Sequence, residues 1–195
     1  RGEGRNCTFY GHEVIGARMT AQIMERLKFP RELSEKVIRL VRYHLFYYHP
    51  DEVTESSVRR LLANVGPENM EDLLKVREAD RIGSGTPKAI PYKLRHLKYV
   101  VDKVSHDPIS VKMLKVNGND VMKMLGIAPG PKIGLLLNSL LAGVLDDPSR
   151  NAREYLEQRL RELDKKSPDE LRTALEKIER AQEKEEKERM KKYYV

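Results

Sequence analysis

Residues 116–156 read VNGNDVMKMLGIAPGPKIGLLLNSLLAGVLDDPSRNAREYL, and this stretch decides the fold class. NGND (117–120) is typical of a helix start, because Asn and Asp side chains accept hydrogen bonds from exposed backbone N–H groups. GIAPGPKIG (126–134) predicts a tight turn that leads into an apolar helix over 132–146. Ser149 is placed to cap the helix that follows. The stretch therefore predicts helices joined by short turns.

Helical periodicity continues on both sides of this stretch. Apolar residues recur at spacings near 3.6 over 11–28, 31–48 and 90–105. Other helices are expected from an N-cap at Thr54 to Gly66-Pro67, from a cap at Asn69 with Asp72 to Gly83, and after a capping box at Ser167–Glu170. We predict an all-α fold, a multi-helix array of about eight or nine helices without a significant sheet.

Two of these predicted helices have a distinct apolar side. The first carries Val14, Ile15, Met19, Ile23, Met24 and Leu27 at helical spacing. The helix over 90–105 has Leu94, Leu97, Val101 and Val104 on one face.

Composition shifts along the chain predict three parts. GSGTP (83–87) is the most linker-like stretch, which places a boundary between a helical subdomain over 1–86 and a helical body over 87–165. Residues 166–195 form a third part, a charged C-terminal helix with almost no apolar face beyond Leu171, Leu175 and Ile178.

Charge and cysteine content narrow the class of protein. The 195 residues include one Cys and carry a net charge of +7, so no internal disulfide can form and a reducing, cytoplasmic location is expected. The longest apolar stretch (133–145) is too short to span a bilayer, so no membrane partner is expected. Residues 87–132 hold nine Lys and Arg against three Asp and Glu, a net charge of +6. This excess favours a polyanionic partner; the alternative is a basic protein without one.

Three side chains are candidate metal ligands. His12, His44 and Asp80 fall at the ends or inner faces of the first four predicted helices. Imidazole and carboxylate are the usual ligands of hydrolytic metals, and a bound divalent ion could activate water against a phosphodiester. The alternative is that the histidines pack in the core and that Asp80 pairs with a neighbouring Arg.

Longer segments resemble a known family. FYGHEVIGARMTAQIMERLKFP (9–30), VIRLVRYH (37–44) and LLKVREADRIGSG (73–85) resemble the second half of an HD domain. More specifically, they resemble the HD region of the bacterial tRNA nucleotidyltransferase (CCA-adding) and poly(A) polymerase family. Residues 116–156 are similar to the helical body of that family. The resemblance covers residues 7 to 160.

The resembled family has two features that we do not find in this sequence, the HD motif proper and a catalytic head. In that family the HD motif proper, a first His and then a His-Asp dipeptide, lies upstream of the matched segment, as does a catalytic head that binds nucleotide and Mg²⁺. Neither pattern occurs here, and His106-Asp107, far downstream, is expected to be a helix terminus. We therefore expect no cofactor in this chain, no catalytic residues and no nucleotide addition by this chain alone. A divalent metal at His12, His44 and Asp80 would be an incomplete site.

An RNA-binding surface is the function that remains. Cations that could contact phosphate lie in the basic segment at Lys93, Arg95, Lys98 and Lys103, and Tyr92 and Tyr99 among them could stack on bases. The Gly130–Lys132 turn leads into a helix N-terminus, which favours phosphate, although its glycines could equally serve packing.

We therefore expect a tRNA-binding helical region with tRNA or another structured RNA as partner. The alternatives are a metal-dependent HD-type phosphohydrolase and a non-catalytic helical scaffold. The sequence does not predict an oligomeric state.

Overall fold

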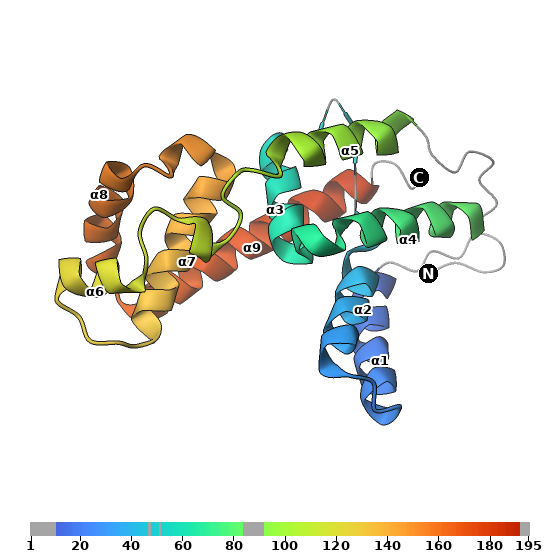
Figure 1. Cartoon of the computed structure of the whole chain (residues 1–195), viewed down its shortest axis with the longest axis horizontal. Helices are drawn as coiled ribbons and strands as arrows, with labels where there is room; N and C mark the ends of the chain where they lie inside the picture. The colour runs from blue at the N-terminus through green and yellow to red at the C-terminus, as the bar shows by residue number, and fades with distance from the viewer. Residues whose placement is uncertain (1–10, 47, 51, 84–91, 192–195) are drawn as a thin grey trace. The chain divides into compact units, whose positions relative to one another are not determined.

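The computed structural model describes residues 11–46, 48–50, 52–83 and 92–191 (Figure 1). Within these ranges the structure holds nine α-helices and no strand, which confirms the all-α prediction. The helices are α1 (His12–Arg26), α2 (Arg31–Tyr43), α3 (Glu55–Val65), α4 (Met70–Gly83), α5 (Tyr92–Val104), α6 (Gly118–Leu125), α7 (Pro131–Asp146), α8 (Arg153–Asp164) and α9 (Pro168–Lys191). None of the described helices is long and apolar enough to cross a membrane.

The chain divides into two compact units. The first combines Arg1–Tyr48 with Val65–His96, and the second combines His49–Asn64 with Leu97–Val195. Helices α3 and α5 therefore each contribute to both. Most of the predicted linker, from residue 84 on, lies outside the described residues. The three-part division predicted from composition stays a prediction.

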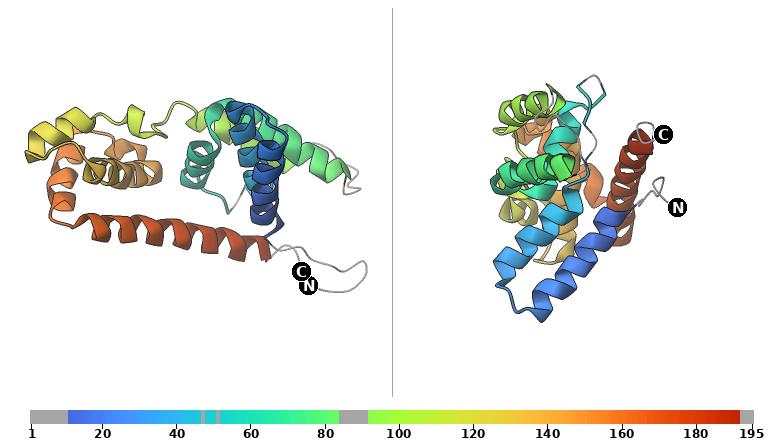
Figure 2. Two further views of the ribbon diagram at one scale, coloured as in Figure 1. Left: turned by 90° about the horizontal axis from the view of Figure 1, so that it is seen from below. Right: turned by 90° about the vertical axis from the view of Figure 1, so that its right-hand side faces the viewer.

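In the first unit, α1 and α2 form an antiparallel hairpin (Figures 1 and 2). They approach closely at Gly16, where an added Cβ would lie 3.3 Å from Val41 Cγ1. Helix α2 ends at Tyr43, one residue before His44, whereas the sequence predicted that it would continue to residue 48. There the His44 ring Nδ1 lies 2.7 Å from the Val41 carbonyl oxygen, which has no partner further along the helix.

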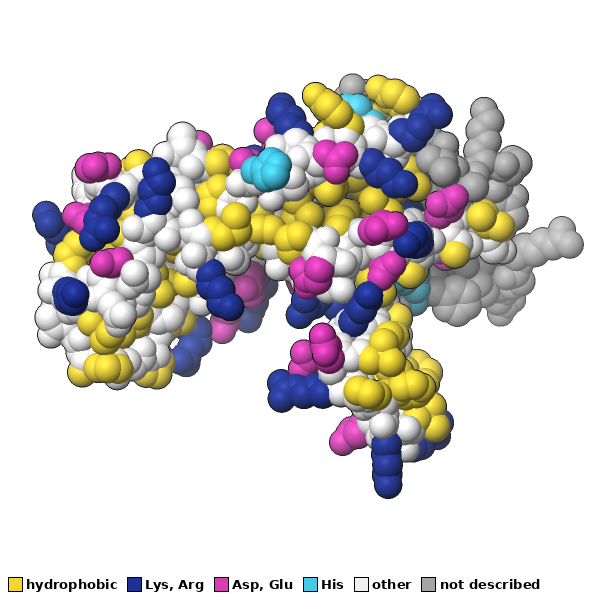
Figure 3. Space-filling model, viewed as in Figure 1, with side chains coloured by type: hydrophobic (Ala, Val, Ile, Leu, Met, Phe, Trp, Pro, Cys, Tyr) yellow, Lys and Arg dark blue, Asp and Glu magenta, His cyan; other side chains and the backbone are white. Residues whose placement is uncertain are grey.

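The apolar side predicted for α1 is only partly buried. Met24 is in the core, whereas Ile15, Met19, Ile23 and Leu27 are exposed, and Figure 3 shows hydrophobic side chains gathered over this hairpin. The face turned inward carries small residues such as Gly16 and Ala17, which the apolar periodicity does not single out.

Two predictions about α3 and α4 have different outcomes. Thr54 caps α3 as predicted, because its Oγ1 accepts the Ser57 backbone N–H at 3.3 Å. Asn69 was expected to cap α4, but its buried amide donates to the Val65 carbonyl oxygen at 3.0 Å. Asn69 therefore satisfies the C-terminus of α3 and ends a short 3₁₀ turn before α4.

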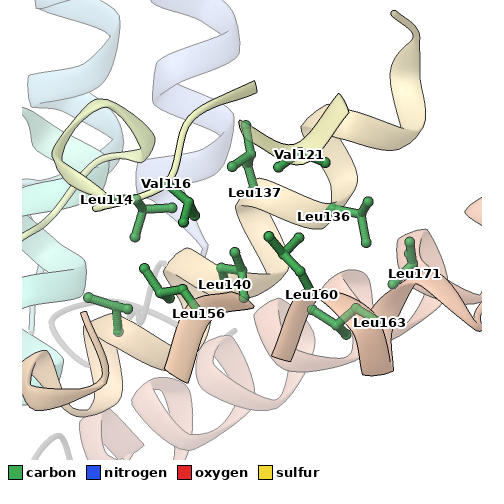
Figure 4. Close-up of a cluster of buried hydrophobic side chains, with 11 residues drawn as sticks. Leu114, Val116, Val121, Leu136, Leu137, Leu140, Leu156, Leu160, Leu163 and Leu171 are labelled. Carbon is green, nitrogen blue, oxygen red and sulfur yellow. The ribbon is translucent and has the colours of Figure 1, made fainter. Parts of the chain in front are cut away.

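The core of the second unit is a leucine- and valine-rich cluster between α6, α7, α8 and the first turn of α9 (Figure 4). NGND starts α6 as predicted: the Asn117 side chain accepts from the N–H groups of Asn119 and Asp120, and Asp120 accepts from the Asn117 N–H. Leu171 is fully buried in this cluster, and α9 packs on α7 through its N-terminal part. The capping box at Ser167 and Glu170 is also present.

The loop before α8 differs from the prediction. Ser149 does not cap α8; its N–H and its hydroxyl both donate to the Asp147 carboxylate, at 3.0 and 2.7 Å. Asp147 therefore caps a 3₁₀ turn (Pro148–Arg150), and α8 starts at Arg153 after Ala152. Asn151 fixes this loop, because its amide donates to the Met113 carbonyl and accepts the Lys115 N–H.

Candidate nucleic-acid interface

Helix α5 has one buried face and one exposed face. Leu94, Leu97, Val100 and Val104 are buried, and Val101, predicted in place of Val100, is half-buried. The opposite side presents Tyr92, Arg95, Tyr99 and Lys103, which follow one another at intervals of three or four residues. Residues at these intervals are neighbours on a helix surface. One helix therefore brings two aromatic rings and two cations of the predicted RNA-binding set onto a single face.

The two tyrosines are strongly exposed, each with 64% of its surface accessible. The Tyr92 ring leans on His96, with ring centroids 6.0 Å apart and the planes tilted by 43°. His96 Nδ1 in turn shares a short hydrogen bond with the Tyr48 hydroxyl. Burial, with a smaller contribution from nearby Tyr92, raises the pKa of Tyr48, so this hydroxyl stays neutral at physiological pH. The sequence analysis did not identify His96, although its position one helical turn after Tyr92 could have indicated it. It also did not identify Tyr48, which lies 48 residues from His96 and which no local pattern indicates.

The cations of α5 differ in their surroundings. Lys93, Arg95 and Lys98 are exposed, and within the described part of the chain Arg95 and Lys98 form no ion pair. Lys103 Nζ lies 2.5 Å from a Glu55 carboxylate oxygen. This contact raises the pKa of Lys103 and lowers that of Glu55. Lys103 is therefore matched by an acidic neighbour, whereas Arg95 and Lys98 are not matched by one among the described residues.

In the glycine-rich turn between α6 and α7, the backbone conformation explains Gly126 but not Gly130. Gly126 ends α6 in the left-handed conformation, with φ of +64°. Gly130 is extended, a conformation that any residue adopts, and an added Cβ there would meet only the Ala128 carbonyl oxygen, at 3.9 Å. Lys132 donates to the Asp164 carboxylate at 2.5 Å and to the Asp164 carbonyl at 3.0 Å. Its ammonium group is thus held at the end of α8, by a partner 32 residues away that no local pattern indicates.

The predicted metal ligands are brought together only in part. His12 Nε2 and His44 Nε2 lie 3.2 Å apart. Asp80 accepts from Arg77 at 3.3 Å, and the described residues contain no group of three or more His, Cys, Asp or Glu side chains arranged to hold a metal ion. Beside the histidines, Glu13 is buried, and its Oε2 has no hydrogen-bond partner among the residues described. The described donors therefore do not fit the three-ligand set of a catalytic metal centre.

Comparison with known proteins gives consistent matches. A family model for tRNA nucleotidyltransferase domain 2 matches residues 15–160. An A-adding tRNA nucleotidyltransferase of Deinococcus radiodurans is 30% identical over 138 residues, which cover 68% of this chain and 30% of that protein. A CC-adding tRNA nucleotidyltransferase of Thermus thermophilus is 29% identical over 133 residues, which cover 68% of this chain and 29% of that protein. No solved structure matches the chain.

The chain thus spans less than a third of the length of these curated relatives. The family match includes α5, α6, the turn after it, α7 and the first part of α8, and it ends before α9. On the strength of that match, which extends over most of its length, this chain belongs to the tRNA nucleotidyltransferase domain 2 family.

Proposed function

We propose that this chain is a tRNA-binding helical region of a cytoplasmic tRNA nucleotidyltransferase, which holds tRNA while a separate catalytic part works on its 3′ end. The observation that carries the proposal is the exposed basic and aromatic face of α5, in a chain whose relatives are named as tRNA nucleotidyltransferases. Nucleotide addition, with its nucleotide and Mg²⁺, belongs in this proposal to the catalytic part.

Phosphate contacts are the role proposed for the cations. Lys93, Arg95 and Lys98 are exposed on one helix: Arg95 and Lys98 are neighbours on its surface, while Lys93 lies on another side of its first turn, so the three can contact separate phosphates of an RNA backbone. Such contacts position an RNA without reading its sequence, which suits recognition of tRNA by shape. Lys103 and Lys132, which each have a carboxylate partner, contribute less than Arg95 and Lys98.

Salt dependence tests the phosphate contacts directly. Each contact lowers the slope of log affinity against log salt by about 0.9, so three contacts predict roughly a 40-fold loss of tRNA affinity between about 50 and 200 mM salt. Filter binding or fluorescence anisotropy with labelled tRNA measures this slope. Affinity that does not change with salt would contradict the proposal, and absence of binding at low salt would favour the scaffold alternative.

One observation, the pair of histidines, bears on a second candidate function, although the described residues supply no third ligand for a catalytic metal centre. The 3.2 Å separation of the His12 and His44 Nε2 atoms is one that two imidazole ligands of a single metal ion could have. A metal-dependent phosphohydrolase would carry manganese, nickel or zinc in stoichiometric amount. Elemental analysis of the purified protein and of the His44→Ala variant tests this: metal present in the first and lost in the second would support the hydrolase.

A further inference from the structure

The exposed tyrosines of α5 point to a more specific ligand than a phosphate backbone. Tyr92 and Tyr99 are seven residues apart on one continuous helix, which places them two turns apart along one face, about 10.5 Å in rise. Arg95 lies between them, three residues after one and four before the other. In Figure 3, hydrophobic, basic and histidine side chains lie together over this helix.

Phosphate binding alone does not account for these rings. A phenol ring adds no positive charge, and leaving two of them 64% accessible keeps apolar surface in water. The aromatic face is instead what stacks on a nucleobase, an interaction worth about 1–3 kcal/mol per base and tolerant of sequence. In an RNA duplex the base faces are already stacked, so only unpaired nucleotides can offer them.

The environment of Tyr92 suits such a contact. Its ring rests against His96, and His96 is held by the hydrogen bond to Tyr48. Side-chain ordering is one of the entropic costs of binding, and a ring that is already supported loses less freedom when a base stacks on it.

We propose that this face of α5 binds an unpaired strand of RNA, with bases stacked on Tyr92 and Tyr99 and the intervening phosphate contacted by Arg95. This inference rests on the proposed RNA-binding function and narrows it from structured RNA in general to a single-stranded segment. An end or a loop of a folded RNA would provide such a segment.

The test compares two probes on the intact chain. One is a single-stranded RNA octamer carrying 2-aminopurine, whose emission reports stacking and is easily read because the protein has no Trp. The other is a blunt-ended RNA duplex. We expect Tyr92→Leu and Tyr99→Leu each to weaken octamer binding by roughly 5- to 150-fold, as loss of one stacked base predicts, while duplex affinity and the salt slope stay unchanged.

Three controls make the result specific. Tyr92→Phe and Tyr99→Phe keep the ring and should bind the octamer as the wild type does. Tyr155→Leu removes another exposed tyrosine, 41% accessible on α8, and should change neither probe. Circular dichroism melting of each variant shows that the fold is retained.

The possible outcomes separate this inference from the function on which it rests. Salt-dependent binding of RNA that is indifferent to Tyr92→Leu and Tyr99→Leu would overturn the single-strand proposal and leave the tRNA-binding function standing. An equal loss for octamer and duplex would overturn it as well. Absence of any RNA binding would remove both.

Discussion

Arg59 is a buried cation whose three guanidinium nitrogens each have a partner within the second unit. Its side chain is 5% exposed, and Nε donates to the Leu145 carbonyl at 2.8 Å while Nη2 donates to the Asp146 carbonyl at 3.1 Å. Nη1 lies 3.1 Å from the Asp107 carboxylate. The guanidinium therefore satisfies the C-terminal carbonyls of α7, where the helix dipole also favours a cation. His106-Asp107, the sequence expected to be a helix terminus, does follow α5 and supplies one of these partners.

We expect Arg59→Met to lower the free energy of unfolding by about 3–5 kcal/mol, because it leaves a carboxylate and two carbonyls without their donor. Urea denaturation followed by circular dichroism measures the change. Arg180→Met is the control: that arginine is exposed and pairs with Glu176 on the same helix, so its loss should cost less than about 0.5 kcal/mol. A loss below about 1 kcal/mol for Arg59→Met would show that the network contributes little.

The capping box of α9 predicts a pH dependence. Hydrogen bonds from the Ser167 backbone N–H and hydroxyl lower the pKa of Glu170 from 4.5. Because the folded pKa is the lower one, this contribution to stability is present above the unfolded pKa and is lost as the pH falls through the folded pKa. We expect Glu170→Gln to be less stable than wild type at neutral pH, with the difference shrinking below about pH 5. Urea midpoints across this pH range measure it, and a difference independent of pH would contradict the assignment.

At the scale of elements, the sequence predicts what depends on near neighbours. The capping boxes at Asn117–Asp120 and Ser167–Glu170 join residues three apart, so their patterns are visible in the chain. The prediction that Ser149 caps α8 is wrong because Asp147, two residues earlier, is the stronger acceptor at the same turn and binds the Ser149 N–H. The 3.6-residue period cannot decide whether Val100 or Val101 is the buried residue, because both lie near the edge of the same apolar face.

What the sequence could not predict depends on residues far apart in the chain. The face of α5 could be derived from its own spacing, which is why Tyr92, Arg95 and Tyr99 are found together. The pairing of Lys103 with Glu55 joins residues 48 apart, and that of Lys132 with Asp164 joins residues 32 apart. Only the fold shows that these two lysines are already engaged. The proximity of His12 and His44 likewise follows from the α1–α2 hairpin.

The two glycines of the turn between α6 and α7 should respond differently to substitution. Gly126→Ala places a Cβ in a left-handed conformation, and we expect it to lower the free energy of unfolding by about 1 kcal/mol. Gly130→Ala fits an extended backbone with open space and should change stability by less than about 0.5 kcal/mol. Thermal melting of the two variants side by side measures the contrast, and equal effects would mean that the turn rearranges.

At the scale of the whole molecule, the distribution of charge matters more than its sum. The net charge is +7, but the cations are unequal. Helix α9 holds seven Lys and Arg against eight Asp and Glu, and its Arg172 and Arg180 lie 3.8 and 3.3 Å from acidic side chains of the same helix, so α9 carries almost no net charge. Arg95 and Lys98 are exposed on α5 without such a partner among the described residues. A polyanion should therefore distinguish these helices although both are rich in cations.

Two variants with the same net charge separate a local interface from a general attraction. Lys93→Glu with Lys98→Glu on α5, and Arg172→Glu with Arg180→Glu on α9, each change the net charge by −4, from +7 to +3. If RNA binds at α5, the first variant should lose affinity for tRNA by at least roughly tenfold and show a shallower salt slope, because two phosphate contacts are removed and two repulsive charges added. The second should bind within about twofold of wild type at about 150 mM salt, where the Debye length is about 8 Å and a charge that contacts no phosphate is largely screened. Fluorescence anisotropy with labelled tRNA measures both affinities. Equal losses would show that the total charge of the chain attracts RNA, and a loss confined to the α9 variant would place the interface on that helix.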